Sequence, residues 1–393
     1  MFAQRMNRLG TETAFEVLAK AKALEAEGRD IVHMEIGEPD FATPENIVDA
    51  GCRALREGHT HYGPSAGLPE LREAIAEDVS RTRGIEVHPD QVVVTPGAKP
   101  ILFFAALALL EPGDEALYPD PGFPIYESVI NFAGAKPVPV PLREENEFAL
   151  AVEDVAERIG PKTKLLIVNS PQNPTGSVLR REDVEQIAQL AVEHNLIVLS
   201  DEVYNRILFE GEHVSFASIP GMQERTILVD GFSKTYAMTG WRIGYSVSNR
   251  QLAEKFARLQ TNSNSCTATF TQIACIEALR GPQDAVDKMV AEFRRRREFI
   301  VRGLNELPGV SCVLPHGAFY VFPNVKKTGF SCRELQERML EEAGVALLSG
   351  TCFGKYGEGY LRLSYATSLE RIEECLSRMR RWLEEHGVEE NAG

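Results

Sequence analysis

The segment that decides the fold reads Ser233-Lys234-Thr235-Tyr236-Ala237-Met238-Thr239-Gly240-Trp241-Arg242. It follows the apolar run Thr226-Ile227-Leu228-Val229, which is typical of a buried β-strand. The segment that follows this strand therefore carries a hydroxyl, a primary amine and a guanidinium. Serine and arginine together suit a phosphate, because a hydroxyl and a planar guanidinium both donate to its oxygens. A lysine between them can form a Schiff base with an aldehyde that carries a phosphate.

Pyridoxal phosphate (PLP) is such an aldehyde, and its pyridine ring needs an acid that keeps the ring nitrogen protonated. The apolar run Leu196–Ser200 ends in Asp201-Glu202-Val203-Tyr204. A carboxylate at the tip of a buried strand is costly unless a cation pairs with it, and a pyridinium would do so. The alternative for Asp201 is a helix N-cap. Tyr204 can donate a hydrogen bond to the ring's phenolic oxygen.

Two more strand ends carry groups that bind anions. The run Leu165–Val168 enters a rigid turn at Asn169–Gly176, where Asn173 precedes a proline and is biased toward extended angles. The run Gln91–Val94 breaks at Thr95-Pro96-Gly97-Ala98, and a helix opens at Lys99-Pro100. The amides at that helix N-terminus form a natural phosphate cradle.

The whole pattern resembles the class I aminotransferases, which are fold-type I PLP enzymes, and most closely their bacterial aspartate-aminotransferase-like subgroup. The matching segments occur in the family's order and spread across nearly the whole chain. They are Gly37–Phe41, Tyr62–Gly67, Gly97–Lys99, Asn169–Gly176, Asp201–Tyr204, Ser233–Arg242, Gly317–Tyr320 and Arg362–Ala366. One such motif alone is weak, but eight in register are strong.

The resemblance implies an α/β fold with two domains. The larger domain, residues 44–280, would hold PLP on a mostly parallel mixed sheet sandwiched by helices. Residues 281–393 would form a smaller α+β domain, with the N-terminal segment 1–43 packed against it. Within these regions the patterning predicts helices at Thr13–Glu27, Arg181–Asn195, Asp284–Leu304, from Cys332, and at Ser368–His386. Short strands are expected around Val313 and Phe319–Phe322, and a frayed tail at 389–393.

The resemblance also implies a role for each matched residue around PLP. Lys234 would carry PLP and, once freed, move the substrate proton, while Asp201 would pair with the ring nitrogen. Tyr204 and Asn173 would hold the ring oxygen, and Phe123 would stack on the ring face. The phosphate would be held by Gly97, Ala98, Lys99, Ser233 and Arg242.

The substrate and the assembly follow from the same resemblance. Arg362 would bind the substrate α-carboxylate with its two-pronged guanidinium, and Gly37 would add a backbone N–H. Phe123, Asn173 and Lys99 would also contact the substrate. Tyr62 would cross to the phosphate of the neighbouring subunit in a homodimer.

Composition and motif content limit the partners, the cellular location and the bound groups that the sequence predicts. A net charge of −15 argues against nucleic acid or an anionic membrane as partner. The chain has seven cysteines without a C-x-x-C pair and no apolar leader at its N-terminus, which favours reduced thiols in the cytoplasm. His59 and His61 have no further ligand at a suitable spacing, so no metal site is predicted. No G-x-G-x-x-G follows a strand, so a dinucleotide site is not predicted either.

The predicted reaction is ping-pong transfer of an L-amino acid's amino group to a 2-oxoacid such as 2-oxoglutarate. A PLP-dependent C–S lyase or another β- or γ-eliminating enzyme is the alternative on the same scaffold. Lys99 favours aspartate or glutamate as donor, since a cation near the site attracts a second carboxylate. An ungapped alignment places Glu16 near the same site, and its charge would repel an acidic side chain. Alanine and aromatic amino acids are the alternative donors.

Overall fold

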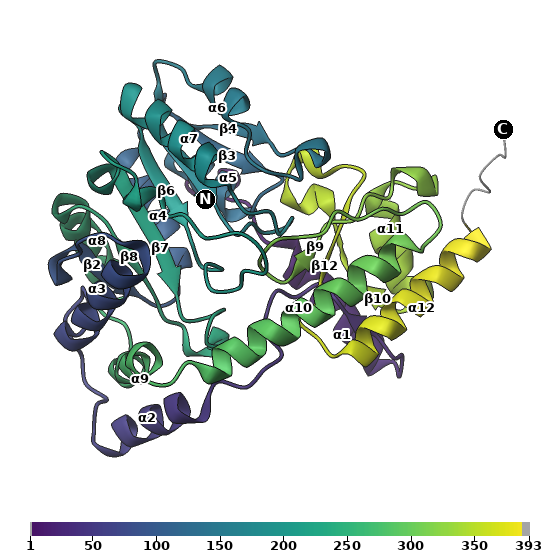
Figure 1. Ribbon diagram of the computed structural model, residues 1–393, viewed down its shortest axis with the longest axis horizontal. Helices are drawn as coiled ribbons and strands as arrows, with labels where there is room; N and C mark the ends of the chain where they lie inside the picture. The colour runs from purple at the N-terminus through teal and green to yellow at the C-terminus, as the bar shows by residue number, and fades with distance from the viewer. Residues whose placement is uncertain (1, 387–393) are drawn as a thin grey trace.

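A seven-stranded sheet forms the centre of the computed structural model, which describes residues 2–386. The strands lie in the order β2-β8-β7-β6-β5-β3-β4, and β8 runs antiparallel to both of its neighbours (Figure 1). The remaining pairs are parallel, as expected for a mostly parallel mixed sheet. The strands are β2 Val92–Thr95, β3 Glu115–Asp120, β4 Lys136–Pro141, β5 Thr163–Asn169, β6 Ile197–Asp201, β7 Thr226–Gly231 and β8 Gly244–Val247.

Helices cover both faces of this sheet, because the buried strands are apolar on both sides. On one face, α4, α5 and α8 pack on Val93, Ile167, Leu199 and Ile227. On the other face, α3 and α9 pack near β2, β7 and β8, and α7 packs near β5 and β6. The helices of this part are α2 Glu45–Arg56, α3 Pro69–Arg83, α4 Lys99–Leu109, α5 Ile125–Ala133, α6 Val152–Arg158, α7 Arg181–Glu193, α8 Arg250–Ser263 and α9 Thr269–Arg280.

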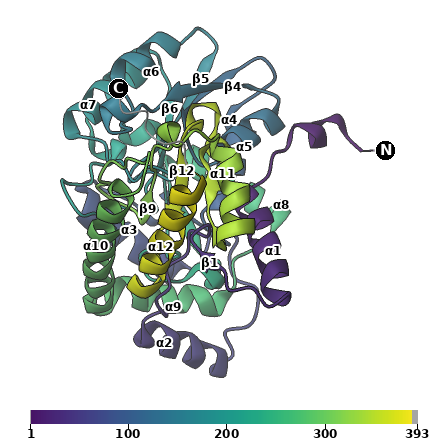
Figure 2. The same ribbon diagram turned by 90° about the vertical axis from the view of Figure 1, so that its right-hand side faces the viewer.

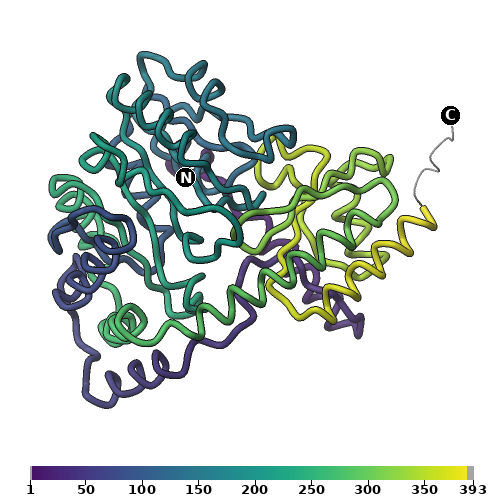
Figure 3. Tube along the Cα trace, viewed as in Figure 1, coloured from purple at the N-terminus to yellow at the C-terminus, as the bar shows by residue number. Residues whose placement is uncertain are grey.

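A second group of elements lies beside the sheet and is built from the N-terminal and C-terminal segments of the described chain (Figures 2 and 3). Strand β1 of the N-terminal segment pairs in parallel with β10, and β11, β12 and β9 form a three-stranded antiparallel sheet. Strands β1, β9, β10 and β12 share one apolar core with α10 and α12. Their bounds are α1 Thr13–Ala26, β1 Val32–His33, α10 Asp284–Asn305, β9 Tyr320–Val321, α11 Cys332–Arg338, β10 Val345–Ala346, β11 Leu348–Ser349, β12 Leu361–Ser364 and α12 Leu369–His386.

The element predictions hold with two corrections. The helices predicted from Thr13, Arg181, Asp284 and Cys332 begin at those residues. The strand predicted around Val313 is wrong, because that residue lies in a loop beside a single bridge between Ser311 and Asn324. Strand β9 is shorter than the predicted Phe319–Phe322. The tail 389–393 lies outside the described residues.

Helix α10 contains four consecutive arginines, residues 294–297, of which the first two are exposed. Arg296 and Arg297 are buried, and they bond Asp40 at 2.7 Å and Glu210 at 3.0 Å respectively. Their charges are therefore compensated across helix and loop. No helix among residues 2–386 is long and apolar enough to cross a membrane.

Candidate active site

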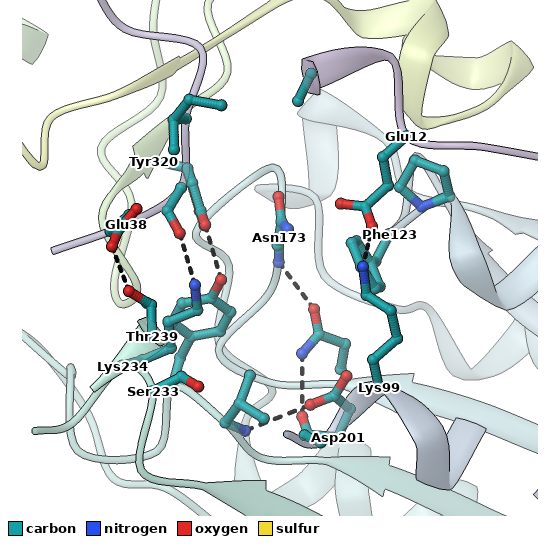
Figure 4. A pocket seen from close by; sticks show the side chains of 18 of the residues that line it. Glu12, Glu38, Lys99, Phe123, Asn173, Asp201, Ser233, Lys234, Thr239 and Tyr320 are labelled. Atoms are coloured by element: carbon teal, nitrogen blue, oxygen red, sulfur yellow. Dashed lines mark hydrogen bonds and ion pairs between the residues drawn. The ribbon is translucent and has the colours of Figure 1, made fainter. Parts of the chain in front are cut away.

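The carboxyl ends of the central strands open into one cavity of about 570 Å³ (Figure 4). The register brings those ends level, since Asn169 of β5 pairs with Asp201 of β6, and Asp201 pairs with Val229 of β7. Most of the residues predicted from the sequence line this cavity. They are Gly37, Ala98, Lys99, Phe123, Asn173, Asp201, Tyr204, Ser233, Lys234, Arg242 and Arg362.

Lys234 follows β7 and points its amine into the cavity. Its Nζ donates to the carbonyl oxygen of Gly37 at 2.6 Å, which ties the strand end to the N-terminal segment. Burial lowers the pKa of Lys234 to about 8, the Glu38 carboxylate opposes this effect, and the Arg362 and Arg242 cations add to it. A lysine with such a pKa is partly neutral near pH 7 to 8, which is the state that attacks a carbonyl carbon.

Asp201 ends β6 with a buried carboxylate. The Tyr126 hydroxyl donates to its Oδ2 at 2.6 Å, and the Val203 amide donates to its Oδ1 at 3.4 Å. Burial raises the pKa of Asp201 to about 6, although these two hydrogen bonds act to lower it and the nearby Asp230 and Glu202 carboxylates raise it further. A cation placed opposite Asp201 would favour its ionised form.

The two carboxylates behind Asp201 contact basic side chains. Arg83 of α3 donates to Glu202 at 3.0 Å and to Asp230 at 2.8 Å, and His213 lies 2.9 Å from Glu202. Burial alone would raise the pKa of Glu202, but the charges of His213 and Arg83 hold it at about 2. Burial raises the pKa of Asp230 to about 6, although the Arg83 charge acts to lower it, so Glu202 is the carboxylate that stays ionised next to Asp201.

The turn before α4 and the loop after β7 form a corner of the cavity that suits a phosphate. Gly97 has φ +87°, and a Cβ atom at this position would collide with the Arg242 guanidinium. A Cβ atom on Gly244 would lie 2.5 Å from the Ala98 nitrogen, so the turn before α4 packs directly on β8. Helix α4 begins at Lys99, and its first amides have no intrahelical acceptor. Amides, the Ser233 hydroxyl and a guanidinium thus line one corner.

Arg362 of β12 supplies a buried cation on the opposite wall. Its Nη1 lies 3.5 Å from the Asn173 Oδ1, and its Nη2 donates to the Glu35 carbonyl oxygen. The Tyr204 and Tyr320 hydroxyls are 2.7 Å apart beside it, and a Cβ atom on Gly37 would collide with the Tyr320 hydroxyl. Position 37 therefore accepts only a glycine, which lets the Tyr320 ring lie against the backbone beside Arg362.

Lys99 lies on the cavity wall in an ion pair with Glu12 (Figure 4). Its Nζ is also 5.5 Å from the centre of the Phe123 ring. The placement of Glu16 predicted from the ungapped alignment is wrong: Glu16 is exposed, whereas Glu12 and Thr13 line the cavity. Helix α1 begins at Thr13, and its first residues up to Phe15 line the cavity, whereas the Glu16 side chain lies on the exposed face of the helix.

Comparisons with known proteins identify this arrangement. Residues 29–379 match the family described as Aminotransferase class I and II. The chain belongs to this family. It is 48% identical over 361 residues to the aspartate aminotransferase of Pyrococcus abyssi, covering 91% of this chain and 92% of that protein. It is 45% identical over 359 residues to aromatic-amino-acid aminotransferase 2 of Thermococcus litoralis, covering 90% and 92%.

A solved structure gives the same assignment. The aspartate aminotransferase of Thermus thermophilus with maleate superposes with a TM-score of 0.92 at 40% identity, covering 97% of this chain and 99% of that one. The protein is therefore a PLP-dependent aminotransferase of fold type I. The cavity fits PLP, since a buried carboxylate, an amine of lowered pKa and an amide-lined corner meet there. The lyase alternative has no support from these relatives.

Three residues of this aminotransferase site were not predicted from the sequence. Tyr126 binds Asp201, Tyr320 binds Tyr204, and Glu12 binds Lys99. Tyr126 lies in the first turn of α5, three residues after Phe123, and the centroids of the two rings are 5.7 Å apart. No local sequence pattern predicts that Glu12 lies at the site. Tyr62 does not line the cavity, and its side chain is 90% exposed.

Proposed function

We propose that this aminotransferase takes its amino group from aspartate or glutamate and passes it to a 2-oxoacid such as 2-oxoglutarate, in two ping-pong half-reactions. The observation that carries the proposal is a pair of cations, Arg362 and Lys99, on the wall of a single cavity. One cation suits the α-carboxylate, and the second suits the distal carboxylate of a dicarboxylic substrate. The aspartate aminotransferases among the relatives support this choice.

The residues of the cavity divide the work of the reaction. PLP, when bound, stabilises the negative charge that develops at the substrate α-carbon. Lys234 holds PLP and carries the proton to and from that carbon, which its lowered pKa favours. Asp201 holds the ring nitrogen in its protonated form, and Arg362 with the Gly37 backbone orients the substrate. The remaining contacts are assigned to Tyr204 and Asn173 at the ring oxygen, Phe123 at the ring face, and Gly97, Ala98, Lys99, Ser233 and Arg242 at the phosphate.

A second donor class is favoured by the Glu12 ion pair. While Glu12 holds Lys99, a distal carboxylate must displace Glu12 before it can bind. The neighbouring wall of Phe15, Leu102 and Phe123 is apolar and suits alanine or an aromatic side chain. The aromatic-amino-acid aminotransferase among the relatives supports this alternative.

A panel of amino donors with 2-oxoglutarate tests the assignment. We expect aspartate and glutamate to give the highest kcat/KM in the wild type. In Lys99→Ala, kcat/KM for aspartate should fall about tenfold or more, as expected for a charged hydrogen bond, while the value for alanine stays within about twofold. Equal losses for both donors would contradict the distal role of Lys99. An amino donor without an acceptor should convert the bound PLP once to its pyridoxamine form, without continuous release of ammonia.

The assembly and setting are proposed on the same basis. The enzyme would be a cytoplasmic homodimer in which Tyr62 reaches the phosphate of the partner subunit, without nucleic acid or membrane as partner. The 90% exposure of Tyr62 supports a role outside its own subunit. The proposed domain division stays at 1–43, 44–280 and 281–393, and pairing of β1 with β10 supports the placement of the N-terminal segment.

A further inference from the structure

A short backbone strip, residues 33–37, contacts Arg362 and Lys234, two of the basic residues assigned to the proposed reaction. It starts in β1, whose Val32 and His33 pair with Val345 and Ala346 of β10. The Glu35 carbonyl oxygen accepts from Arg362 Nη2, and the Gly37 carbonyl oxygen accepts from Lys234 Nζ at 2.6 Å. A charge on this strip therefore acts directly behind the substrate-binding wall.

Glu35 places a negative charge there. Its side chain is fully buried, and Oε1 lies 2.8 Å from His33 Nδ1. Among the described residues, Oε2 has no hydrogen-bond partner. Burial lowers the pKa of Arg362, and the Glu35 charge is among the influences that oppose this lowering. The carboxylate is thus felt by the guanidinium although the two side chains form no direct hydrogen bond.

His33 supplies the compensating charge. Its Nδ1 lies 2.8 Å from Glu35, and its Nε2 lies 3.0 Å from Glu25 of α1. Ionised carboxylates only accept hydrogen bonds, so when Glu35 and Glu25 are both ionised, both ring nitrogens of His33 carry protons and the ring is an imidazolium. The hydrogen bond from Glu35 raises the pKa of His33, burial opposes it, and Glu25 adds to the rise. The ring is 28% exposed and can exchange its proton with solvent.

We propose that His33 is a positioning residue for carboxylate binding: its positive charge neutralises Glu35 and so leaves Arg362 available to the substrate α-carboxylate. The inference rests on the proposed role of Arg362. When His33 loses its proton, the buried charge of Glu35 is no longer neutralised. Its field then acts on the Arg362 guanidinium. The uncompensated charge of Glu35 then repels the substrate carboxylate through space, and carboxylate affinity falls.

The other charged groups around β1 are engaged elsewhere. Lys22 of α1 pairs with Glu25 at 2.8 Å, and Arg371 and Arg378 of α12 pair with Asp30. Within residues 2–386, His33 is the one cation within ion-pair distance of Glu35. Because the pKa of His33 is raised in the fold, its compensation is complete below the ordinary histidine pKa. Compensation is lost as the pH rises through the raised value.

The binding of maleate to the PLP-loaded enzyme, followed by absorbance from about pH 6 to about pH 9, tests this proposal. In the wild type, the Kd should rise about fivefold or more across the titration of His33, the lower range for coupling between two sites. His33→Gln should bind maleate weakly at every pH in this range. Glu35→Gln, and the double variant His33→Gln/Glu35→Gln, should bind tightly with a flatter pH profile.

Two controls isolate the effect. His88→Gln removes a histidine that also pairs with a carboxylate, Asp90 at 2.9 Å, but far from the cavity, and should match the wild type. Arg362→Gln should weaken maleate binding about tenfold or more, as loss of a charged hydrogen bond requires. If Arg362→Gln binds weakly while His33→Gln matches the wild type, the His33 proposal alone is overturned. If both variants match the wild type, the proposed function of Arg362 fails as well.

A measurement without PLP or substrate guards against misfolded variants. The His33 ring protons of the wild-type protein should titrate by NMR with a pKa above the ordinary value, and Glu35→Gln should lower that pKa. The unfolding midpoint of the wild type should fall as the pH rises through the His33 titration, and this fall should be smaller in Glu35→Gln. An unshifted His33 titration in the wild type would overturn the proposal.

Discussion

The two walls of the cavity hold their charges in different ways. On the sheet wall, burial moves Asp201 and Lys234 toward their neutral forms, with pKa values of about 6 and 8. On the facing wall, Glu12 of the N-terminal segment pairs with Lys99 of α4, and Arg362 is held by a backbone carbonyl oxygen. The sheet wall is thus ready to exchange protons, whereas the facing wall keeps full charges. Changes on the first should act mainly on kcat, and changes on the second mainly on KM.

The largest effect is expected from the lysine of the sheet wall. Lys234→Ala should lower kcat at least about 10⁴-fold while PLP is still bound, because one amine supplies both the covalent link and the proton transfer. Lys99→Ala is the matched control, since it removes the other lysine of the same cavity. Borohydride should fix PLP to Lys234 in the wild type and in Lys99→Ala. A labelled peptide from another part of the chain would refute the assignment.

Asp201 should come next. Asp201→Asn keeps the shape and the Tyr126 hydrogen bond but removes the charge, and we expect a loss of roughly 10²- to 10³-fold in kcat. Asp120→Asn provides the control: Asp120 is another buried strand-end carboxylate with a pKa raised by burial to about 6, but it lies outside the cavity lining. It should cost stability without a comparable loss of kcat. Near wild-type kcat in Asp201→Asn would exclude the role at the ring nitrogen.

Tyr62 tests whether the sheet wall is completed by a second subunit. Tyr62→Phe should raise the Kd for PLP about tenfold, the cost of one hydrogen bond to a charged group, without changing the unfolding of the apoprotein. In a mixture of Lys234→Ala and Tyr62→Phe chains, half of the sites in each mixed dimer carry neither change. PLP affinity and activity should therefore partly recover. A mixture that shows no recovery would mean that Tyr62 acts within its own chain or not at all.

The smallest effect should come from the facing wall. Glu12→Gln frees Lys99 from a partly exposed ion pair, so KM for aspartate should fall about two- to fivefold with little change in kcat. Glu16→Gln removes a similar charge less than two turns away on an exposed face and should leave both constants unchanged. Equal effects of the two substitutions would mean that the KM responds to the overall charge and not to the loss of the Glu12–Lys99 ion pair.

The same contrast explains what the sequence predicts. Asp201 and Lys234 each follow an apolar run, so their strand-end positions can be read locally, and parallel strands bring those ends to one edge. The Glu12–Lys99 pair joins residues 87 positions apart, and the contact between Arg362 and Glu35 joins residues 327 apart. Neither contact has a local pattern. The error at Glu16 arose because an ungapped alignment assigns one residue to a position of the family and does not show which residues of α1 face the cavity.

The short pairing between β1 and β10 also sets an order of events during synthesis. Val32 pairs with Val345, so a strand made early has no partner until 313 more residues have been added. At about 5–20 residues per second, that interval is roughly 15–60 s. Throughout it, the apolar side chains of Val32 and Met34 lack the core that buries them. A nascent chain can therefore assemble the central sheet, and even present Lys234, well before Arg362 exists to select a substrate.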